Sequence, residues 1–403
     1  MSISINKKHR DIFFLFAAAA AIISSGFELW PFNNSRAWQI LNISNLCCII
    51  GIAGLISTFI QKNKPHKASI YIPHISIIAY LVINFLSIGF ADSFQRAASY
   101  TLKLWLVFLG GFWLFQRAMS NKKNIHTIYA FAAATLIISI LGCLFVSLSS
   151  TQSRHGFFDS PFKYGTYSAV LVPLCCMYLF SGSKLQTILA VSILAAYALS
   201  METAGCLIAI TAGLITGFLM TNKKSVKIKI LVGILLFTSS FVLAGKHNDI
   251  KNDFVLKEKD SVNLRQRYIE WQAAINLLQN RGIIGTGAGC INDYRSYYYY
   301  RLPKLDTLKA FDQNGFLTVG AETGIFGSAA FCWIIMHFGS RLNHHKRYIL
   351  SANRITAANA AAFTAALTAN IFSSIHYNGI LIVFVFLLSL ISAVNTIFAG
   401  AEK

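Results

Sequence analysis

The chain has 403 residues, of which 55% are apolar and only 12% are charged, and 35 Lys and Arg against 15 Asp and Glu give it a net charge of +20 at pH 7. A soluble domain carries about 25% charged residues. The composition therefore excludes a soluble globular protein, and it also excludes disulfide-rich, collagenous and disordered chains. A strong positive charge suits either a nucleic acid or a membrane, and the high apolar fraction selects the membrane.

Apolar runs close to the length of a membrane-spanning helix, about 20 residues, recur along the chain. We count twelve: 11–30, 37–60, 70–91, 98–116, 125–147, 164–182, 186–200, 204–220, 228–245, 314–338, 355–375 and 380–399. The first run follows Lys7, Lys8 and Arg10 as a secretory signal would, but no A-x-A-like cleavage site comes after it, so we count it as a span. The pattern predicts an all-α polytopic membrane protein with about 12 transmembrane helices.

The basic residues predict the orientation of these spans. More than half of the Lys and Arg lie in alternate connections that share one side of the membrane. The opposite short connections contain only Arg36, Arg96, Arg154 and Lys163. The positive-inside rule therefore places both termini in the cytoplasm. Because orientation accounts for these charges, no nucleic-acid partner is expected.

The predicted organisation has three parts. Spans 1–9 occupy residues 1–245, one large outward-facing loop occupies 246–312, and spans 10–12 occupy 313–403. Inside the loop, LRQRYIEWQAAINLLQN (264–280) has an apolar stripe that is typical of an amphipathic helix lying on the outer membrane surface. The stripe consists of Leu264, Tyr268, Trp271, Ile275 and Leu278.

Arg267 falls on the edge of this stripe, at the depth of the lipid headgroups. An arginine there can bind a phosphate with two parallel hydrogen bonds, or simply extend its charged end to water. Gly285, Gly287 and Gly289 follow the helix in RGIIGTGAGC. Their G-x-G-x-G spacing comes after a helix rather than a strand, so a dinucleotide-binding loop is excluded and a tight turn is predicted.

The eight cysteines predict no disulfide and no metal site. Seven lie in or at the ends of apolar spans, and Cys290 is alone in the outward loop. No CxxC or Cys/His spacing indicates zinc.

Three motifs in chain order resemble one family, the O-antigen ligase and O-antigen polymerase-like integral membrane proteins. RHGFFDSPFKYGTYSAVLVP, from Arg154, is similar to the R-x-x-G-x-F-x-x-P-N motif before the family's sixth span. RYIEWQAAINLLQNRGIIGTGAG (267–289) is similar to its R-x-x-x-W helix followed by G-x-G in the large periplasmic loop. QNGFLTVGAETGIFG (313–327) is similar to the H-N-x-x-L, E-x-G-x-x-G signature that opens the tenth span.

The resemblance implies an activity, a substrate and a location. It implies an inverting glycosyltransferase of the bacterial inner membrane that moves a glycan from undecaprenyl pyrophosphate to a hydroxyl of lipid A-core, on the periplasmic side and without a metal or other cofactor. The alternative is a polymerase that joins repeat units from the same donor. A polytopic transporter or a catalytically silent homologue is a further possibility.

The resemblance also implies which residues bind the donor. A leaving pyrophosphate gains negative charge, which fixed guanidinium groups stabilise in a partly dry site. We expect Arg267 to have this role, with Arg154 next and Arg265 and Arg301 as further contributors.

Two departures from the family pattern affect the expected chemistry. Gln313 stands where the family has His, and Thr203 stands where it has Arg. Gln313 cannot accept the acceptor's proton, although Gln313 and Asn314 can orient a hydroxyl by hydrogen bonding.

Other residues are therefore candidates for the base. They are Asp312, beside Gln313, and His376 in IHYNG. Glu322 matches the family signature, but ten helical positions beyond Asp312 it lies about 15 Å away along the axis, which favours a role in a polar network.

Overall fold

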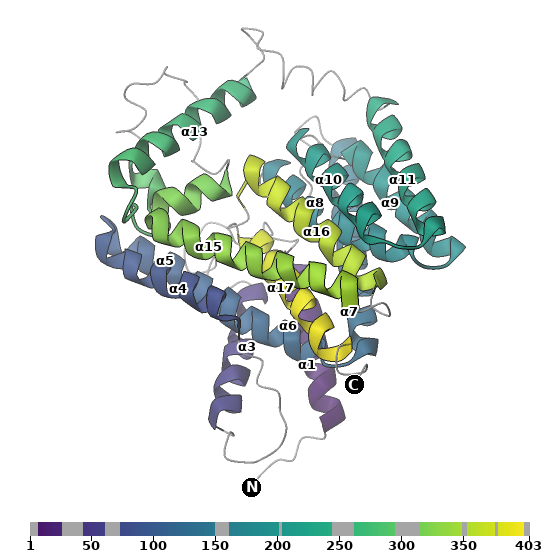
Figure 1. The fold of residues 1–403 in the computed structure, drawn as a ribbon, viewed down its shortest axis with the longest axis horizontal. Helices are drawn as coiled ribbons and strands as arrows, with labels where there is room; N and C mark the ends of the chain where they lie inside the picture. Colours follow the sequence, from purple (N-terminus) through teal and green to yellow (C-terminus); the bar gives the residue numbers. More distant parts are fainter. Residues whose placement is uncertain are drawn as a thin grey trace.

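The computed structural model describes residues 7–25, 43–60, 73–149, 161–200, 204–243, 262–294, 314–348, 353–374 and 378–398. Within these ranges the secondary structure is helical and contains no strand, which confirms the all-α prediction for the described chain. Figure 1 shows the arrangement of the helices. Their bounds are α1 Lys7–Ser25, α3 Ile43–Ile60, α4 Ile75–Ser87, η2 Ile88–Phe90, α5 Phe94–Trp105, η3 Leu106–Gly111, α6 Phe112–Ala118, α7 Lys122–Ser149, α8 Pro161–Phe180, α9 Lys184–Ser200, α10 Ala204–Met220, α11 Lys224–Leu243, α13 Val262–Arg281, η4 Ile291–Tyr294, α15 Gly315–Tyr348, α16 Asn353–Phe372 and α17 Asn378–Phe398.

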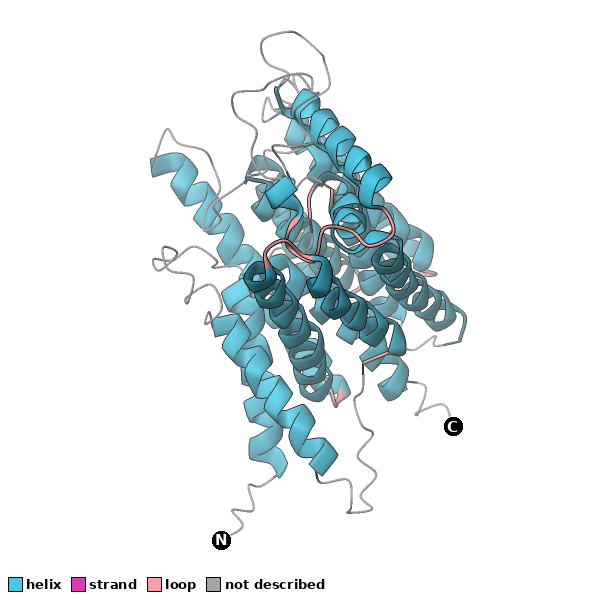
Figure 2. Cartoon of the chain, turned by 90° about the vertical axis from the view of Figure 1, so that its left-hand side faces the viewer, coloured by secondary structure: helices cyan, strands magenta, loops and turns pink. Residues whose placement is uncertain are grey.

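The apolar helices form a bundle, and Figure 2 shows many of them running in similar directions. Each of the twelve predicted runs overlaps a helix. Among the described residues, four helical segments are both long and apolar enough to cross a bilayer, and several shorter apolar helices accompany them. The four are Phe94–Ala118, Lys123–Phe145, Gly315–His344 and Arg354–Phe372. The count of twelve membrane spans and the cytoplasmic location of both termini stay predictions.

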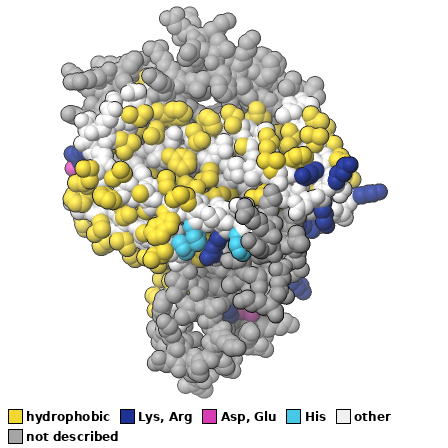
Figure 3. Space-filling view, viewed as in Figure 1, with side chains coloured by type: hydrophobic (Ala, Val, Ile, Leu, Met, Phe, Trp, Pro, Cys, Tyr) yellow, Lys and Arg dark blue, Asp and Glu magenta, His cyan; other side chains and the backbone are white. Residues whose placement is uncertain are grey.

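The centre of the bundle is α17, whose apolar residues from Ile380 to Val394 are buried on every side. A helix that is hydrophobic all round belongs in the interior. The outside of the bundle is apolar too: Figure 3 shows hydrophobic side chains across a broad band of one face. This distribution is typical of a protein whose solvent is lipid rather than water.

Small residues allow the closest helix contacts. A Cβ added to Gly213 of α10 would lie 2.6 Å from the carbonyl oxygen of Ala361 in α16. Likewise, a Cβ on Gly51 of α3 would lie 1.9 Å from the carbonyl oxygen of Gly110 in the π-helical turn η3. Association of helices in lipid depends on such close packing of glycine and alanine, because burial from water no longer drives it.

The longest described helix, α15, runs across the middle of the molecule, with α4 and α5 on one side and α13 on the other (Figure 1). It is broken at Gly324, where φ is +67° and ψ is −162°. The break divides α15 into a short first segment and a long second one. At the break, backbone groups lose their helical partners, and such groups are costly inside a membrane protein unless other atoms bond to them.

The turn after α13 supplies those partners. In this segment, Gly282–Cys290, hereafter the glycine loop, Thr286 and Gly287 donate their backbone N–H groups to the carbonyl oxygens of Ala321 and Glu322, both at 2.9 Å. In return, Ile325 N–H donates to the carbonyl oxygen of Gly282 at 2.8 Å. The predicted turn is confirmed, and its function in the fold is to complete the hydrogen bonding of a broken helix.

Glycine is required on both sides of this contact. Gly285, Gly287 and Gly289 have φ of +77°, +94° and +73°, values that residues with a Cβ rarely adopt. A Cβ on Gly285 would lie 2.3 Å from the carbonyl oxygen of Glu322, and one on Gly324 would lie 2.3 Å from that of Ile283. The two backbones therefore approach more closely than side chains would permit.

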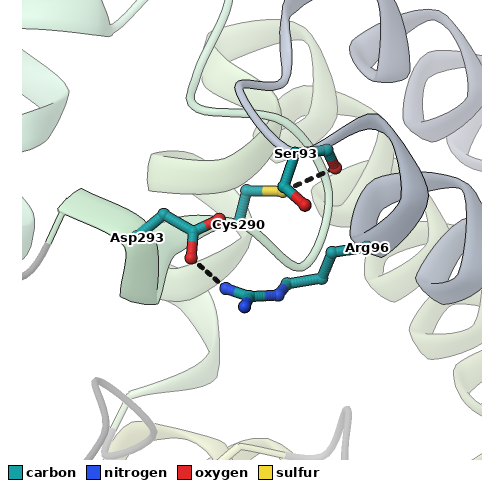
Figure 4. Close-up of polar contacts among 4 residues, drawn as sticks. All are labelled: Ser93, Arg96, Cys290 and Asp293. Atoms are coloured by element: carbon teal, nitrogen blue, oxygen red, sulfur yellow. Dashed lines mark hydrogen bonds and ion pairs between the residues drawn. The ribbon is translucent and has the colours of Figure 1, made fainter.

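The end of the glycine loop is attached to the start of α5. Arg96 forms an ion pair with Asp293, and the Cys290 thiol donates to the carbonyl oxygen of Ser93 at 3.7 Å (Figure 4). Burial, and after it the charges of Asp293 and Glu322, raises the pKa of the Cys290 thiol to about 11. The thiol is therefore protonated at neutral pH and acts as a donor rather than as a nucleophile.

We expect Gly324→Ala to destabilise the protein, because the added Cβ meets the backbone of Ile283 and this positive-φ conformation costs about 1–3 kcal/mol for a residue with a side chain. Thermal unfolding of the detergent-purified chain measures the effect. Gly89→Ala is the matched control, since a Cβ at Gly89 meets nothing within 4 Å. Equal melting temperatures for the two variants would show that the break does not depend on glycine.

Candidate functional site

The directions of the helices bring several ends together at one end of the bundle. Arg354, at the start of α16, donates through Nε to the carbonyl oxygen of Tyr178 near the end of α8 at 2.6 Å, so α8 and α16 are antiparallel. A Cβ on Gly205, at the start of α10, would lie 2.7 Å from the Cβ of Phe372 at the end of α16. We call the end where α8, α10 and α15 start and α16 finishes the outer end, which the charge pattern predicts to face the periplasm.

The start of α15 is held at this outer end by two polar side chains. Asn314 caps the helix: its Oδ1 accepts from the backbone N–H groups of Phe316 at 3.0 Å and Leu317 at 3.1 Å. Asn370 of α16 is buried against Gly315, the first residue of α15, since a Cβ on Gly315 would lie 1.9 Å from the Oδ1 of Asn370. The amide oxygen of Asn314 is thus occupied by the cap, and only its amide nitrogen is left to orient a substrate hydroxyl.

The first segment of α15 and α13 run in the same direction and are in register. Gly320 packs near Leu278, and Gly282 accepts from Ile325. A helix rises about 1.5 Å per residue. Measured from the contact between Leu278 and Gly320, Arg267 therefore lies about 16 Å along α13 and Asn314 about 9 Å along α15, both toward the outer end. Their backbones therefore differ by about 7 Å in level, which is within the reach of an arginine side chain.

The face of α13 that packs on α15 is centred away from the predicted stripe, of which Leu278 reaches Gly320 of α15. Ile269, Ala273, Ala274 and Leu277 are buried with Ala321, and they form a small core separate from the main one. Of the predicted stripe, Ile275 is 38% exposed. The helix is confirmed, but apolar periodicity gave too little weight to the two alanines, whose small size allows α13 to approach α15.

Glu322 lies beneath the glycine loop rather than at the start of α15. Glu322 is only 5% exposed, and its charge is one of the causes that raise the pKa of the Cys290 thiol. Its carbonyl oxygen accepts from Gly287. Glu322 therefore links α15 to the glycine loop through its backbone, and a role of its carboxylate in a polar network stays a prediction.

A second pair of polar side chains lies at the outer end, where the start of α8 meets the end of α9. The hydroxyls of Tyr164 and Ser200 are 2.8 Å apart, and both residues are buried. Tyr164 lies within the motif that begins at Arg154, and Ser200 immediately precedes the segment that contains Thr203. The hydrogen bond therefore joins the described ends of two segments that the sequence assigned to the site.

Most of the predicted site residues lie outside what the structure describes. Gln313, Asp312, His376, Arg154, Arg301 and Thr203 fall in the gaps between the described ranges. Arg267 and Arg265 belong to the first turns of α13, but their side chains are not among those described. Their roles stay predictions. The structure describes the helix ends that flank these residues, and those ends meet at the outer end.

Asn370 was missed by the sequence reasoning. It is a fully buried amide in an alanine-rich span, six positions before His376. Polar side chains inside a membrane span are costly and usually mark functional or packing sites. That rule could have identified Asn370 from sequence together with Asn359, the other asparagine of the apolar run 355–375.

A comparison with protein families gives one match, whereas a comparison with curated proteins gives none. The model of the O-antigen ligase family matches residues 169–332, which include α13, the glycine loop and the break in α15. This match supports the resemblance to the O-antigen ligase-like membrane proteins that the motifs predicted.

Proposed function

We propose that the protein is an inner-membrane glycosyltransferase that moves a glycan from undecaprenyl pyrophosphate to a hydroxyl of lipid A-core at the periplasmic face. The observation that carries the proposal is the convergence at the outer end of the starts of α8, α10 and α15 with the end of α16. These ends flank the segments that contain Arg154, Thr203 and Gln313, and the end of α16 precedes His376.

The donor diphosphate requires fixed positive charge. Arg267 is placed on a helix that packs along the first segment of α15, so its backbone is fixed relative to Asn314. A guanidinium held in this way stabilises the charge that develops on the leaving pyrophosphate without reorganising during the reaction. Arg154, Arg265 and Arg301 would complete the positive surface around the diphosphate.

The acceptor hydroxyl must lose its proton as it attacks the sugar. Gln313 and the amide nitrogen of Asn314 can hold the hydroxyl by hydrogen bonding, but neither takes a proton. Asp312 and His376 are the candidate bases. His376 follows the end of α16, which packs against the start of α15, so the chain path favours its approach to the Gln313 segment.

A polymerase that extends the glycan on the same lipid carrier is the second candidate. The observation that favours it is Gln313, because this residue departs from the ligase pattern at the position of the expected base. Gene deletion separates the two activities. Loss of a ligase leaves long glycans on the carrier, whereas loss of a polymerase leaves single repeat units.

We expect Arg267→Ala to lower the rate of glycan transfer about 10²–10³-fold, the usual cost of removing a group that stabilises developing charge. Transfer is measured as glycan-capped lipopolysaccharide in cells, at equal protein levels. Gln279→Ala is the control, because it truncates an exposed polar side chain on the same helix. Normal capping by Arg267→Ala would remove Arg267 from the site.

Gln313→His is expected to raise the transfer rate in vitro, because a neutral imidazole can accept the acceptor's proton. The gain should appear as pH rises through about 6.5, the ordinary imidazole pKa, since only the unprotonated ring is a base. Gln313→Asn keeps an amide and should show no such gain. If Gln313→His does not exceed the wild type at any pH, the base lies elsewhere.

A further inference from the structure

A cluster of aromatic and basic side chains lies at the opposite end of the bundle, far from the candidate site. Trp333, His337 and Arg341 follow one another at steps of four residues on α15, which places them on one face of the helix. His74, which precedes α4, stacks on His337 with ring centroids 3.3 Å apart and planes 14° apart. His74 also meets Trp333 edge to face at 6.2 Å. We call these four residues the inner cluster.

The inner cluster presents hydrogen-bond donors. His74 caps α4, because its Nδ1 accepts from the backbone N–H of Ser76 at 3.2 Å. A neutral imidazole that accepts at Nδ1 carries its proton on Nε2, which can donate. The Nε2 atom of His337 is buried and has no hydrogen-bond partner within the described part of the chain.

Arg341 adds a charge that has no acidic partner among the residues that the structure describes. Its guanidinium is part-buried and donates to the hydroxyl of Ser392 in α17 at 3.2 Å. The sequences of α4 and α17 contain no Asp or Glu, and the one acid of α15, Glu322, is 19 residues away on the other side of the break at Gly324. Arginine at membrane depth is costly unless an anion or water compensates it.

The depth of the inner cluster is that of a membrane–water interface. Arg341 is three residues before the end of the apolar segment Gly315–His344, and His74 immediately precedes the apolar helix Ile75–Phe90. Exposed apolar side chains adjoin the cluster: Trp333 is 42% and Met336 62% exposed. Figure 3 shows His and Arg side chains together at the lower border of the apolar band.

We propose that the inner cluster binds the phosphate headgroup of an anionic phospholipid in the leaflet at this end of the bundle, which the charge pattern predicts to be cytoplasmic. Arg341 and Nε2–H of His74 donate to phosphate oxygens. The acyl chains lie along Trp333 and Met336. Net negative charge is needed because the ammonium of a zwitterionic lipid already neutralises its own phosphate.

The test compares lipids on the full-length protein in detergent. Adding phosphatidylglycerol should raise the melting temperature by several degrees more than phosphatidylethanolamine with the same acyl chains, because a ligand that binds only the folded state stabilises it. Arg341→Gln should abolish this difference and Arg341→Lys should retain part of it. Lys224→Gln, which removes an exposed charge at the start of α11, should leave the difference unchanged.

Other outcomes overturn the proposal. Equal shifts with both lipids, a full difference in Arg341→Gln, or an equal loss in Lys224→Gln would reduce the cluster to general surface charge. An equal shift with inorganic phosphate would assign the site to a free anion. If Arg341→Gln does not fold, His337→Gln is the second variant, because it keeps the arginine and the α4 cap but removes the ring on which His74 stacks. It should weaken the preference for phosphatidylglycerol among the lipids retained through purification. Native mass spectrometry measures that preference.

Discussion

The break of α15 at Gly324 and its completion by the glycine loop are the contact on which the rest of the arrangement depends. A helix interrupted inside a membrane protein must find new partners for its backbone, and here they come from a segment more than thirty residues earlier in the chain. Because the partners are backbone atoms, the distance between the two segments is set by glycine on each side. The contact fixes the loop, the end of α13 and the first segment of α15 as one unit.

The position of the candidate site follows from that unit. Once Gly282 is fixed at the break, α13 must run beside the first segment of α15, and Ala273, Ala274 and Ala321 determine how closely they pack. The arginine-bearing half of α13 then points to the same end as the cap at Asn314. Arg96 and Asp293 attach the same unit to α5, so the outer loop is tied to the bundle at two places (Figure 4). A transferase that must hold a diphosphate and a hydroxyl at a fixed separation benefits from such attachment.

The sequence predicted the helical architecture because each apolar run is long and bounded by charge or by glycine. It predicted the turn at Gly285–Gly289 from spacing, but it could not show that Gly324 breaks a span, since a single glycine is tolerated in most membrane helices. The sequence also could not predict which face of α13 packs on α15. Periodicity favoured the large residues at Trp271 and Ile275, whereas the close approach to α15 uses alanines. Helical rise alone predicts a polar-network role for Glu322, but it could not predict its backbone partner Gly287, which lies 35 residues earlier in the chain.

The two ends of the bundle have different chemistry. The outer end gathers amides, hydroxyls and the helix that carries Arg267, which suits a lipid-linked diphosphate and a hydroxyl acceptor. The inner cluster gathers imidazoles and a guanidinium without acids, which suits a single phosphate. The most direct test of the central claim is a density map of the full-length protein with an undecaprenyl pyrophosphate-linked glycan bound. The account predicts the diphosphate at the outer end, facing Arg267 and the start of α15, and a diphosphate bound instead at the inner cluster or on the outside of the bundle would contradict it.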